Sequence, residues 1–499
     1  MDFSPLLRSE LIEKRDYQIS IADSCVKSNT LVVLPTALGK TVIAILAISK
    51  LIENGGKAIF VAPTRPLVHQ HRSSLIKFLK LNEDEICELN GSIPKQRRKE
   101  LYRTCRIIIS TPQVIENDLE FLTEMKDQFK VLVIDEAHRA IGNYSYVHIA
   151  ESFKDSARII AMTASPGGDV KKINQIMNNL GIQNLEIRDE NSPDVKQYIE
   201  GIEVKWINVD IPVQMKRAIE KIREMLNDKL EKLNNFGFNL KGNSRKELIE
   251  IGETISLKIR EGDKRFYSAA RLRSQAIALD LILEFAETQG LLPLIEYLKE
   301  HQKDEKTNFN SIINSVEFRK LYDELISLSK EPMEKHTPKI PKILELISMN
   351  NVKTIVFCHY RITATILSNL LNKNGISSER FIGQSDRLGD KGLKQSQQKE
   401  ILERFREGSF KVLVATQVGE EGLDVPYADM VIFYEPVPSE IRSIQRRGRT
   451  GRFSKGLVYI LVTKGTRDYS YLYSARRKEF KMKTILKGQK KQHKLDEFL

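Results

Sequence analysis

Cysteine and long apolar runs are scarce in this chain of 499 residues. The cysteines stand at four scattered positions: Cys25, Cys87, Cys105 and Cys358. They form no Cys-x-x-Cys pair, so the sequence predicts reduced thiols and indicates neither a zinc site nor disulfides. The most apolar stretch, residues 31–51, is interrupted by Gly39 and Lys40, so no membrane span is expected. The first residues have neither a basic flank nor an apolar core, so we expect no signal peptide and a cytoplasmic protein.

Positive charge, in contrast, is in excess. The 79 lysines and arginines outnumber the 66 acidic residues and give a formal net charge of +13. This excess favours a polyanionic partner, although it also fits a role in solubility alone. A chain of this length is too long for one hydrophobic core, so we expect about three domains.

Short β-branched runs alternate with helical patterns in two parts of the chain, and each part predicts a parallel sheet covered by helices on both faces. The first part has such runs at residues 31–34, 58–61, 106–109, 131–134 and 158–162. The second part has them at residues 354–357, 411–415, 430–433 and 457–462. The sequence therefore predicts two α/β domains, with ligands at the carboxyl ends of the strands.

The region between them, roughly residues 210–330, has helical periodicity instead. Apolar residues recur there at spacings of three and four: Met215, Ile219, Ile222, Leu226, Leu230 and Leu233. Basic residues occupy the polar face of the same segment: Lys216, Arg217, Lys221, Arg223, Lys229 and Lys232. We expect a helical insertion whose basic face either contacts nucleic acid or is simply solvated.

Gly39, Lys40 and Thr41 follow a predicted strand and open a predicted helix. Backbone N–H groups and the helix N-terminus would face a phosphate there. Lys40 would bridge the β- and γ-phosphates, and the Thr41 hydroxyl would hold Mg²⁺. Leu34 replaces the first glycine of the general phosphate-loop pattern, and a chance Gly-Lys-Thr is the alternative.

Asp135 and Glu136 end a run of four apolar residues. One carboxylate, that of Asp135, would hold Mg²⁺, directly or through water, while the adjacent one would orient and deprotonate the attacking water. Acidic pairs at strand ends are also common surface residues. The phosphate loop upstream and His138 two residues downstream favour the catalytic interpretation.

Arg449 and Arg452 lie at i, i+3 spacing in an arginine-rich segment, on one side of a predicted short helix. They would reach across to the γ-phosphate and neutralise charge that develops during its transfer. The alternative is a basic patch or a phosphate contact on nucleic acid.

Eight segments, in this order, resemble the motifs of superfamily-2 DExH helicases from about Arg15 to Tyr473: residues 15–18, 35–41, 62–65, 110–112, 135–138, 163–165, 419–426 and 445–452. Finer strings are similar to the archaeal Hef helicases, relatives of the Fanconi-anaemia M translocase: residues 139–144, 190–195, 392–395 and 433–438. Pro-Thr-x-x-Gly-Lys-Thr is the usual phosphate loop of this family, which accounts for Leu34 and Ala37.

The resemblance implies a role for each matching residue. ATP contacts would come from Arg15, Gln18, Pro35, Thr36, Ala37, Leu38, Gly39, Lys40, Thr41, Gly422 and Asp424, and the catalytic set would be Lys40, Asp135, Glu136, Gln445, Arg449 and Arg452. Contacts with the tracked strand would come from Thr64, Arg65, Thr111, Gln384, Gln395 and Thr416, and His138, Thr163 and Ser165 would couple nucleotide state to those contacts.

The resemblance also implies the architecture and the activity. We expect RecA-like domains at residues 1–200 and 336–480, a thumb-like DNA-binding insertion at 201–335 and a flexible basic tail at 481–499. The activity would be that of an ATP- and Mg²⁺-dependent helicase or translocase on branched DNA, at the nucleoid. The chain lacks the Glu-Arg-Lys nuclease motif of many Hef proteins, so we expect a motor without a nuclease. An RNA or double-stranded-RNA motor and a non-catalytic DNA-binding scaffold on the sliding clamp are the alternatives.

The last eight residues resemble the peptide that binds the sliding clamp (PCNA). Gln492 would enter a polar pocket, and an apolar plug would be formed by Leu495, Phe498 and Leu499. Residues 487–491 are basic and would present the peptide as a flexible linker. Short motifs of this kind also arise by chance.

Overall fold

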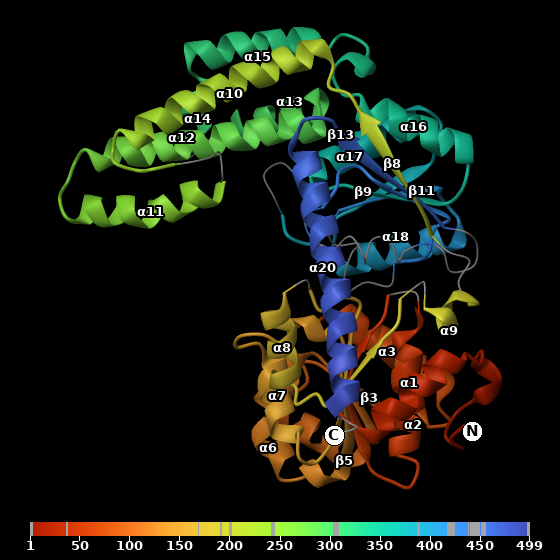
Figure 1. The fold of residues 1–499 in the computed structure, drawn as a ribbon. Helices are drawn as coiled ribbons and strands as arrows, with labels where there is room; N and C mark the ends of the chain where they lie inside the picture. Colours follow the sequence, from red (N-terminus) through yellow and green to blue (C-terminus); the bar gives the residue numbers. More distant parts are fainter. Residues whose placement is uncertain are drawn as a thin grey trace.

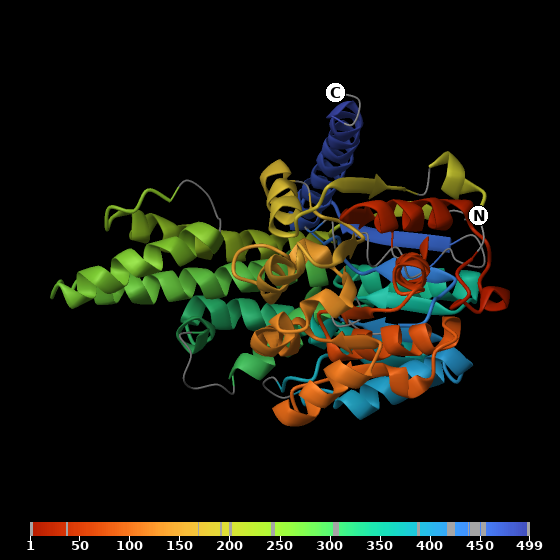
Figure 2. The same ribbon diagram turned by 90° about the horizontal axis from the view of Figure 1, so that it is seen from below.

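The computed structural model of the chain describes residues 3–35, 38–167, 169–189, 192–198, 202–240, 245–302, 309–386, 390–416, 425–437, 439, 450 and 456–496. These residues form two parallel sheets and a helical module, and helices α10, α11 and α12 of the module project away from both sheets (Figure 1 and Figure 2). The predicted fold class, two α/β domains with a helical insertion between them, is confirmed. Among the described residues, each helix is either too short or too polar to span a lipid bilayer.

The first sheet has the strand order β3-β4-β2-β5-β6-β1-β7, and its pairs are parallel. Its strands are β1 (Thr30–Val33), β2 (Lys57–Val61), β3 (Ile86–Leu89), β4 (Ile107–Ser110), β5 (Phe129–Ile134), β6 (Arg158–Thr163) and β7 (Asn184–Ile187). Helices cover both faces, so alternate residues of β1 belong to different cores: Leu31 to one and Val32 to the other. The helices are α1 (Asp16–Lys27), α2 (Lys40–Leu51), α3 (Arg65–Phe78), α4 (Lys95–Thr104), α5 (Pro112–Asn117), α6 (Leu119–Thr123), α7 (Ser145–Phe153), α8 (Val170–Asn179) and α9 (Pro193–Lys196), and the short 3₁₀ turns are η1 (Ser9–Leu11), η3 (Glu83–Glu85), η4 (Lys126–Gln128) and η5 (Ala137–Arg139).

The second sheet has the order β10-β11-β9-β12-β13-β8. Its strands are β8 (Ile202–Val209), β9 (Thr354–Phe357), β10 (Ser378–Phe381), β11 (Val412–Ala415), β12 (Met430–Phe433) and β13 (Gly456–Thr463), and its helices are α16 (Lys339–Asn350), α17 (Arg361–Lys373), α18 (Gln395–Glu407) and α20 (Arg467–Asp496). Strand β8 pairs in parallel with β13 along its whole length. The insertion therefore begins at α10, after this strand, and not at residue 201 as expected.

The insertion packs around its own apolar core. It contains α10 (Val213–Asn234), α11 (Arg245–Arg260), α12 (Phe266–Glu284), the π-helical turn η6 (Phe285–Gln289), α13 (Leu291–Gln302), α14 (Phe309–Ile313) and α15 (Val316–Leu328), and the turn η7 (Met333–Lys335) leads into α16. The periodic apolar residues predicted for its first helix are all buried: Met215, Ile219, Ile222, Leu226, Leu230 and Leu233. The prediction of an amphipathic helix is confirmed.

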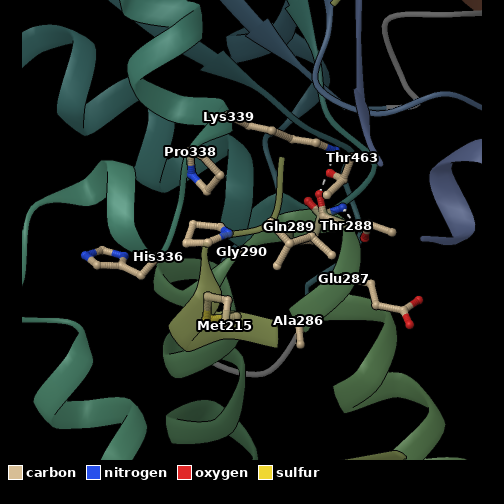
Figure 3. A pocket seen from close by; sticks show the side chains of 12 residues that line it. Met215, Ala286, Glu287, Thr288, Gln289, Gly290, His336, Pro338, Lys339 and Thr463 are labelled. Atoms are coloured by element: carbon tan, nitrogen blue, oxygen red, sulfur yellow. Dashed lines mark hydrogen bonds between the residues drawn. The ribbon is translucent and has the colours of Figure 1, made fainter. Parts of the chain in front are cut away.

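A polar network fixes the insertion to the second sheet domain at the turn η6 (Figure 3). Lys339 Nζ donates to the carbonyl of Thr288, 2.8 Å away, and to Asp468 Oδ2 at 2.6 Å. Gly290 follows the turn with φ of +88°, and a Cβ there would lie 2.9 Å from Thr337 Cγ2. Only glycine fits this close approach without strain.

Helix α20 leaves the second sheet domain and runs along the first, so one helix contacts both (Figure 1). Near its start, Arg476 lies over the ring of Trp206 in β8, 4.2 Å from the centroid. Further along, Met482 is buried in a core of the first domain. The backbone is helical as far as Asp496, so the expectation of a flexible tail at residues 481–499 was wrong for residues 481–496.

Cys87 and Cys105 form a disulfide, so the prediction of reduced thiols was wrong for this pair. Cys87 lies in β3, and Cys105 precedes β4, its neighbour in the sheet, which brings the two Cα atoms to 6.1 Å. That distance lies within the range that a disulfide spans. Cys25 and Cys358 are buried thiols.

Candidate nucleotide site and strand-contact residues

The phosphate loop joins β1 to α2. Gly39 has φ of +73°, and a Cβ at this position would lie 2.5 Å from Gln18 Nε2, so glycine is required. Helix α2 begins at Lys40, whose Nζ donates to the carbonyl of Leu34 at 3.1 Å. The loop therefore places a helix N-terminus and a lysine ammonium group together, the arrangement that binds phosphate.

Gln18 and Tyr17, from α1, brace the same loop. Gln18 Nε2 and the Tyr17 hydroxyl both donate to the carbonyl of Leu38, at 3.1 and 2.9 Å. Arg15 precedes the helix and lies over the ring of Tyr198, 5.6 Å from its centroid. The structure thus places Gln18 against the phosphate loop, with Arg15 three residues before it.

The acidic pair follows β5, beside the phosphate loop. Asp135 and Glu136 are buried, and Glu136 adopts a left-handed backbone conformation with φ of +48°. Asp135 Oδ2 lies 2.9 Å from Nε2 of His71, and the other ring nitrogen of His71 lies 3.5 Å from Thr41 Oγ1. Thr41 and Asp135, the two predicted metal ligands, are therefore connected through one histidine.

Burial would raise the pKa of Asp135, but the hydrogen bond with His71 and the positive charge of Lys40 outweigh it. The pKa of Asp135 consequently lies below its ordinary value, which favours the ionised carboxylate. An ionised carboxylate and a hydroxyl are oxygen ligands of the kind that Mg²⁺ prefers. Glu136 Oε2 is buried and accepts no hydrogen bond in the described part of the chain, although His138 Nδ1 lies 3.2 Å from it. These residues fit a nucleotide with its metal ion.

The predicted coupling residues form a chain that leads away from the acidic pair. His138 Nδ1 lies 3.2 Å from Glu136 Oε2 and 3.1 Å from the hydroxyl of Thr163. The Thr163 hydroxyl donates to the carbonyl of Ser165, and Ser165 Oγ lies 2.9 Å from the sulfur of Met482. A series of side-chain and backbone contacts thus connects the acidic pair to helix α20.

The predicted strand contacts lie where strands end and helices begin. Thr64 is the N-cap residue of α3, Arg65 is its first residue, and Thr111 is the N-cap residue of α5. In the second domain, Thr416 directly follows β11 and Gln395 begins α18. Gln384 follows β10, and its amide donates to Gln398 Oε1 at 3.3 Å.

The basic face of α10 is largely neutralised. Lys221 pairs with Glu324 at 2.7 Å, Lys229 and Lys232 pair with Asp228, and Arg223 pairs with Glu287. These ion pairs favour the solvated-face alternative for those four side chains. Lys216 and Arg217 are exposed.

Several predicted site residues lie outside the described residues: Thr36, Ala37, Gly422, Asp424, Gln445, Arg449, Arg452, Phe498 and Leu499. The backbone of Gln492 and Leu495 lies in α20.

Two residues of the site were missed by sequence reasoning. No sequence pattern marks Met482, because its partner Ser165 is far away in the sequence. A pattern does mark His71, which lies with Val68 and Leu75 at helical spacing on the buried face of α3. A histidine on an apolar helix face needs a polar partner inside the protein.

Each of the three parts of the chain matches a model of a known protein family. The model for DEAD/DEAH box helicases matches residues 15–173, and that for the helicase conserved C-terminal domain matches residues 338–454. Residues 214–332 match a helical-bundle model named for ATP-dependent RNA helicases.

Individual relatives agree with these matches. A protein of Methanocaldococcus jannaschii, named as an ATP-dependent RNA helicase, is 40% identical over 493 residues, which are 97% of this chain and 62% of that protein. The ATP-dependent DNA helicase fml1 of Schizosaccharomyces pombe is 30% identical over 91% of this chain and 57% of its own length. The chain thus spans about three fifths of the length of these two relatives.

Among solved structures, the Hef helicase domain of Pyrococcus furiosus is 40% identical, with a TM-score of 0.72. The match covers 94% of this chain and 100% of that one. The chain therefore belongs to the DEAD/DEAH-box helicases, in the family of the Hef helicase domain.

Proposed function

We propose that this chain is an ATP-dependent DNA helicase or translocase that acts on branched DNA, such as stalled forks. The observation that carries the proposal is that the phosphate loop, the acidic pair and the coupling residues lie together at the carboxyl ends of strands of one sheet. The chain also contains a second sheet domain, to which a helical module is attached. Relatives named as DNA helicases support DNA as the substrate. One relative named as an RNA helicase keeps an RNA motor as the second candidate.

Within this proposal, each residue of the nucleotide site has a task. Lys40 and the start of α2 bind the phosphates, while Thr41 and Asp135 hold Mg²⁺. When bound, the ion supplies positive charge to the phosphate oxygens. Glu136 orients a water molecule and takes its proton. Further contacts to the nucleotide would come from the second domain, through Gly422, Asp424, Gln445, Arg449 and Arg452.

Strand contacts in the proposal come from both sheet domains. Residues at the carboxyl ends of β2 and β4 would hold the phosphodiester backbone from one side, and those after β10 and β11 from the other. Contacts of this kind are blind to base sequence and weaken with salt. Closure of the domains on ATP and reopening after hydrolysis would then move the protein along one strand, at the nucleoid.

We expect ATP hydrolysis by the purified chain to be stimulated most by forked DNA. The measurement is phosphate release with forked DNA, duplex DNA, duplex RNA and no nucleic acid, at equal nucleotide concentration. Equal or greater stimulation by duplex RNA would favour the RNA motor. If hydrolysis stays at background with each of the nucleic acids, the result would favour a DNA-binding scaffold.

We also propose that the C-terminal residues bind a sliding clamp. Leu495→Ala with Phe498→Ala is expected to abolish binding, because each buried large apolar side chain contributes roughly 1.5–3 kcal/mol. Calorimetry with the clamp and the full chain would measure this, and Lys494→Ala, at a position that the motif does not use, is the matched control. Loss of affinity in the control, or none in the double variant, would contradict the proposal.

A further inference from the structure

The side chain of His71 connects three elements of the nucleotide site. It comes from α3, and it is 4% exposed. Its Nε2 lies 2.9 Å from Asp135 Oδ2, after β5, and its Nδ1 lies 3.5 Å from Thr41 Oγ1, in α2. This imidazole therefore contacts both of the proposed metal ligands.

The direction of the two hydrogen bonds follows from the chemistry of the partners. An ionised carboxylate can only accept, so Nε2 of His71 donates to Asp135. In the neutral ring, Nδ1 then accepts from the Thr41 hydroxyl. The hydroxyl hydrogen is thereby directed away from the nucleotide side, which leaves the oxygen lone pairs of Thr41 for a cation. Asp135 contacts His71 through Oδ2, so its Oδ1 is not part of this hydrogen bond.

We propose that His71 is a positioning residue for the metal site: it holds the Thr41 hydroxyl and the Asp135 carboxylate in the orientation that Mg²⁺ requires. The inference rests on the proposed ATP-binding function. Mg²⁺ demands near-ideal octahedral geometry, so a ligand that rotates freely binds it less well. Partners that orient metal ligands typically change metal affinity 10- to 100-fold when they are removed.

Packing is the competing explanation for the position of His71. Its ring lies 4.4 Å from that of Phe60, at an interplanar angle of 33°, and it shares the buried face of α3 with Val68 and Leu75. If His71 served only to fill space, an apolar side chain of similar size would replace it. If it orients the ligands, the replacement must both donate and accept a hydrogen bond.

Glutamine and methionine separate these explanations, because they are nearly equal in size and only glutamine can donate and accept. The test measures ADP affinity of the full chain by calorimetry, in EDTA and over a series of free Mg²⁺ concentrations. His71→Met is expected to raise the half-maximal Mg²⁺ concentration about 10- to 100-fold, and His71→Gln by no more than about threefold. ADP affinity in EDTA should stay unchanged in both, since the phosphate loop is intact. Thermal unfolding without nucleotide checks that the variants fold.

Equal Mg²⁺ requirements for His71→Met and the unmodified chain would overturn the proposal, as would a His71→Gln variant impaired as strongly as His71→Met. Should His71→Met fail to fold, His71→Asn replaces it. Asparagine keeps the donor and the acceptor but is too short to reach both Thr41 and Asp135, so an increased Mg²⁺ requirement is expected, and an unchanged one would overturn the proposal. Absence of Mg²⁺-dependent ADP binding in the unmodified chain is a different result, which would refute the proposed function itself.

Discussion

Replacement of Glu136 by glutamine is expected to lower ATP turnover by about 10²–10⁴-fold, the contribution of a general base, while Mg²⁺-dependent ADP binding is retained. Glutamine keeps the size of the side chain and removes its capacity to take a proton. The carboxylate is placed for this task because it directly follows Asp135 at the end of β5, and His138 Nδ1 lies 3.2 Å from its Oε2. The measurement is phosphate release in a single turnover, with nucleotide binding measured in parallel.

A matched control is available on the same domain. Glu151→Gln changes a carboxylate that is 67% exposed and pairs with Lys154, and we expect turnover to be unaffected. Lys40→Ala provides a contrast, because it removes the ammonium group that holds the phosphates and should weaken nucleotide binding itself. Turnover of Glu136→Gln within a few-fold of normal would exclude Glu136 as the base.

The strands that sequence reasoning found and those that it missed differ in their place in the sheet. Strands β9 and β12 have the predicted bounds, and both are central, with apolar residues on both faces. The missed strands are β3, β7, β8 and β10, and each is the edge of its sheet. Edge strands can carry polar residues, as the Ser-Glu-Arg-Phe sequence of β10 does, so they give no apolar run.

The phosphate loop and the acidic pair could be proposed as a site for a different reason. Their residues lie in short local segments that follow a predicted strand, so local sequence marks them as candidates, and the other proposed site residues came from the family resemblance. His71, Met482 and the disulfide between Cys87 and Cys105 depend instead on contacts between segments remote in sequence. No periodicity encodes such contacts, and only the fold brings these side chains together.

Lys339→Met is expected to destabilise the second sheet domain by about 3–5 kcal/mol, the cost of leaving a buried charge without its partner. Lys339 and Asp468 form an ion pair at 2.6 Å, with side chains that are 3% and 0% exposed. The same ammonium group donates to Thr288 in the turn η6, so its loss also removes a contact that fixes the insertion. Denaturant-induced unfolding, followed by circular dichroism, would measure the change.

Lys342→Met is the matched control, because it changes the same residue type one helical turn later in α16. Lys342 pairs with Glu345 at 2.6 Å, but those side chains are 35% and 50% exposed. Exposed pairs contribute about 0–1 kcal/mol, so this variant should unfold almost as the unmodified chain does. Adding Asp468→Asn to Lys339→Met should recover part of the lost stability, since the uncompensated charge is gone while an oxygen remains for the backbone N–H of Thr463. Equal effects of the two lysine substitutions would show that burial of the Lys339–Asp468 pair does not determine its contribution.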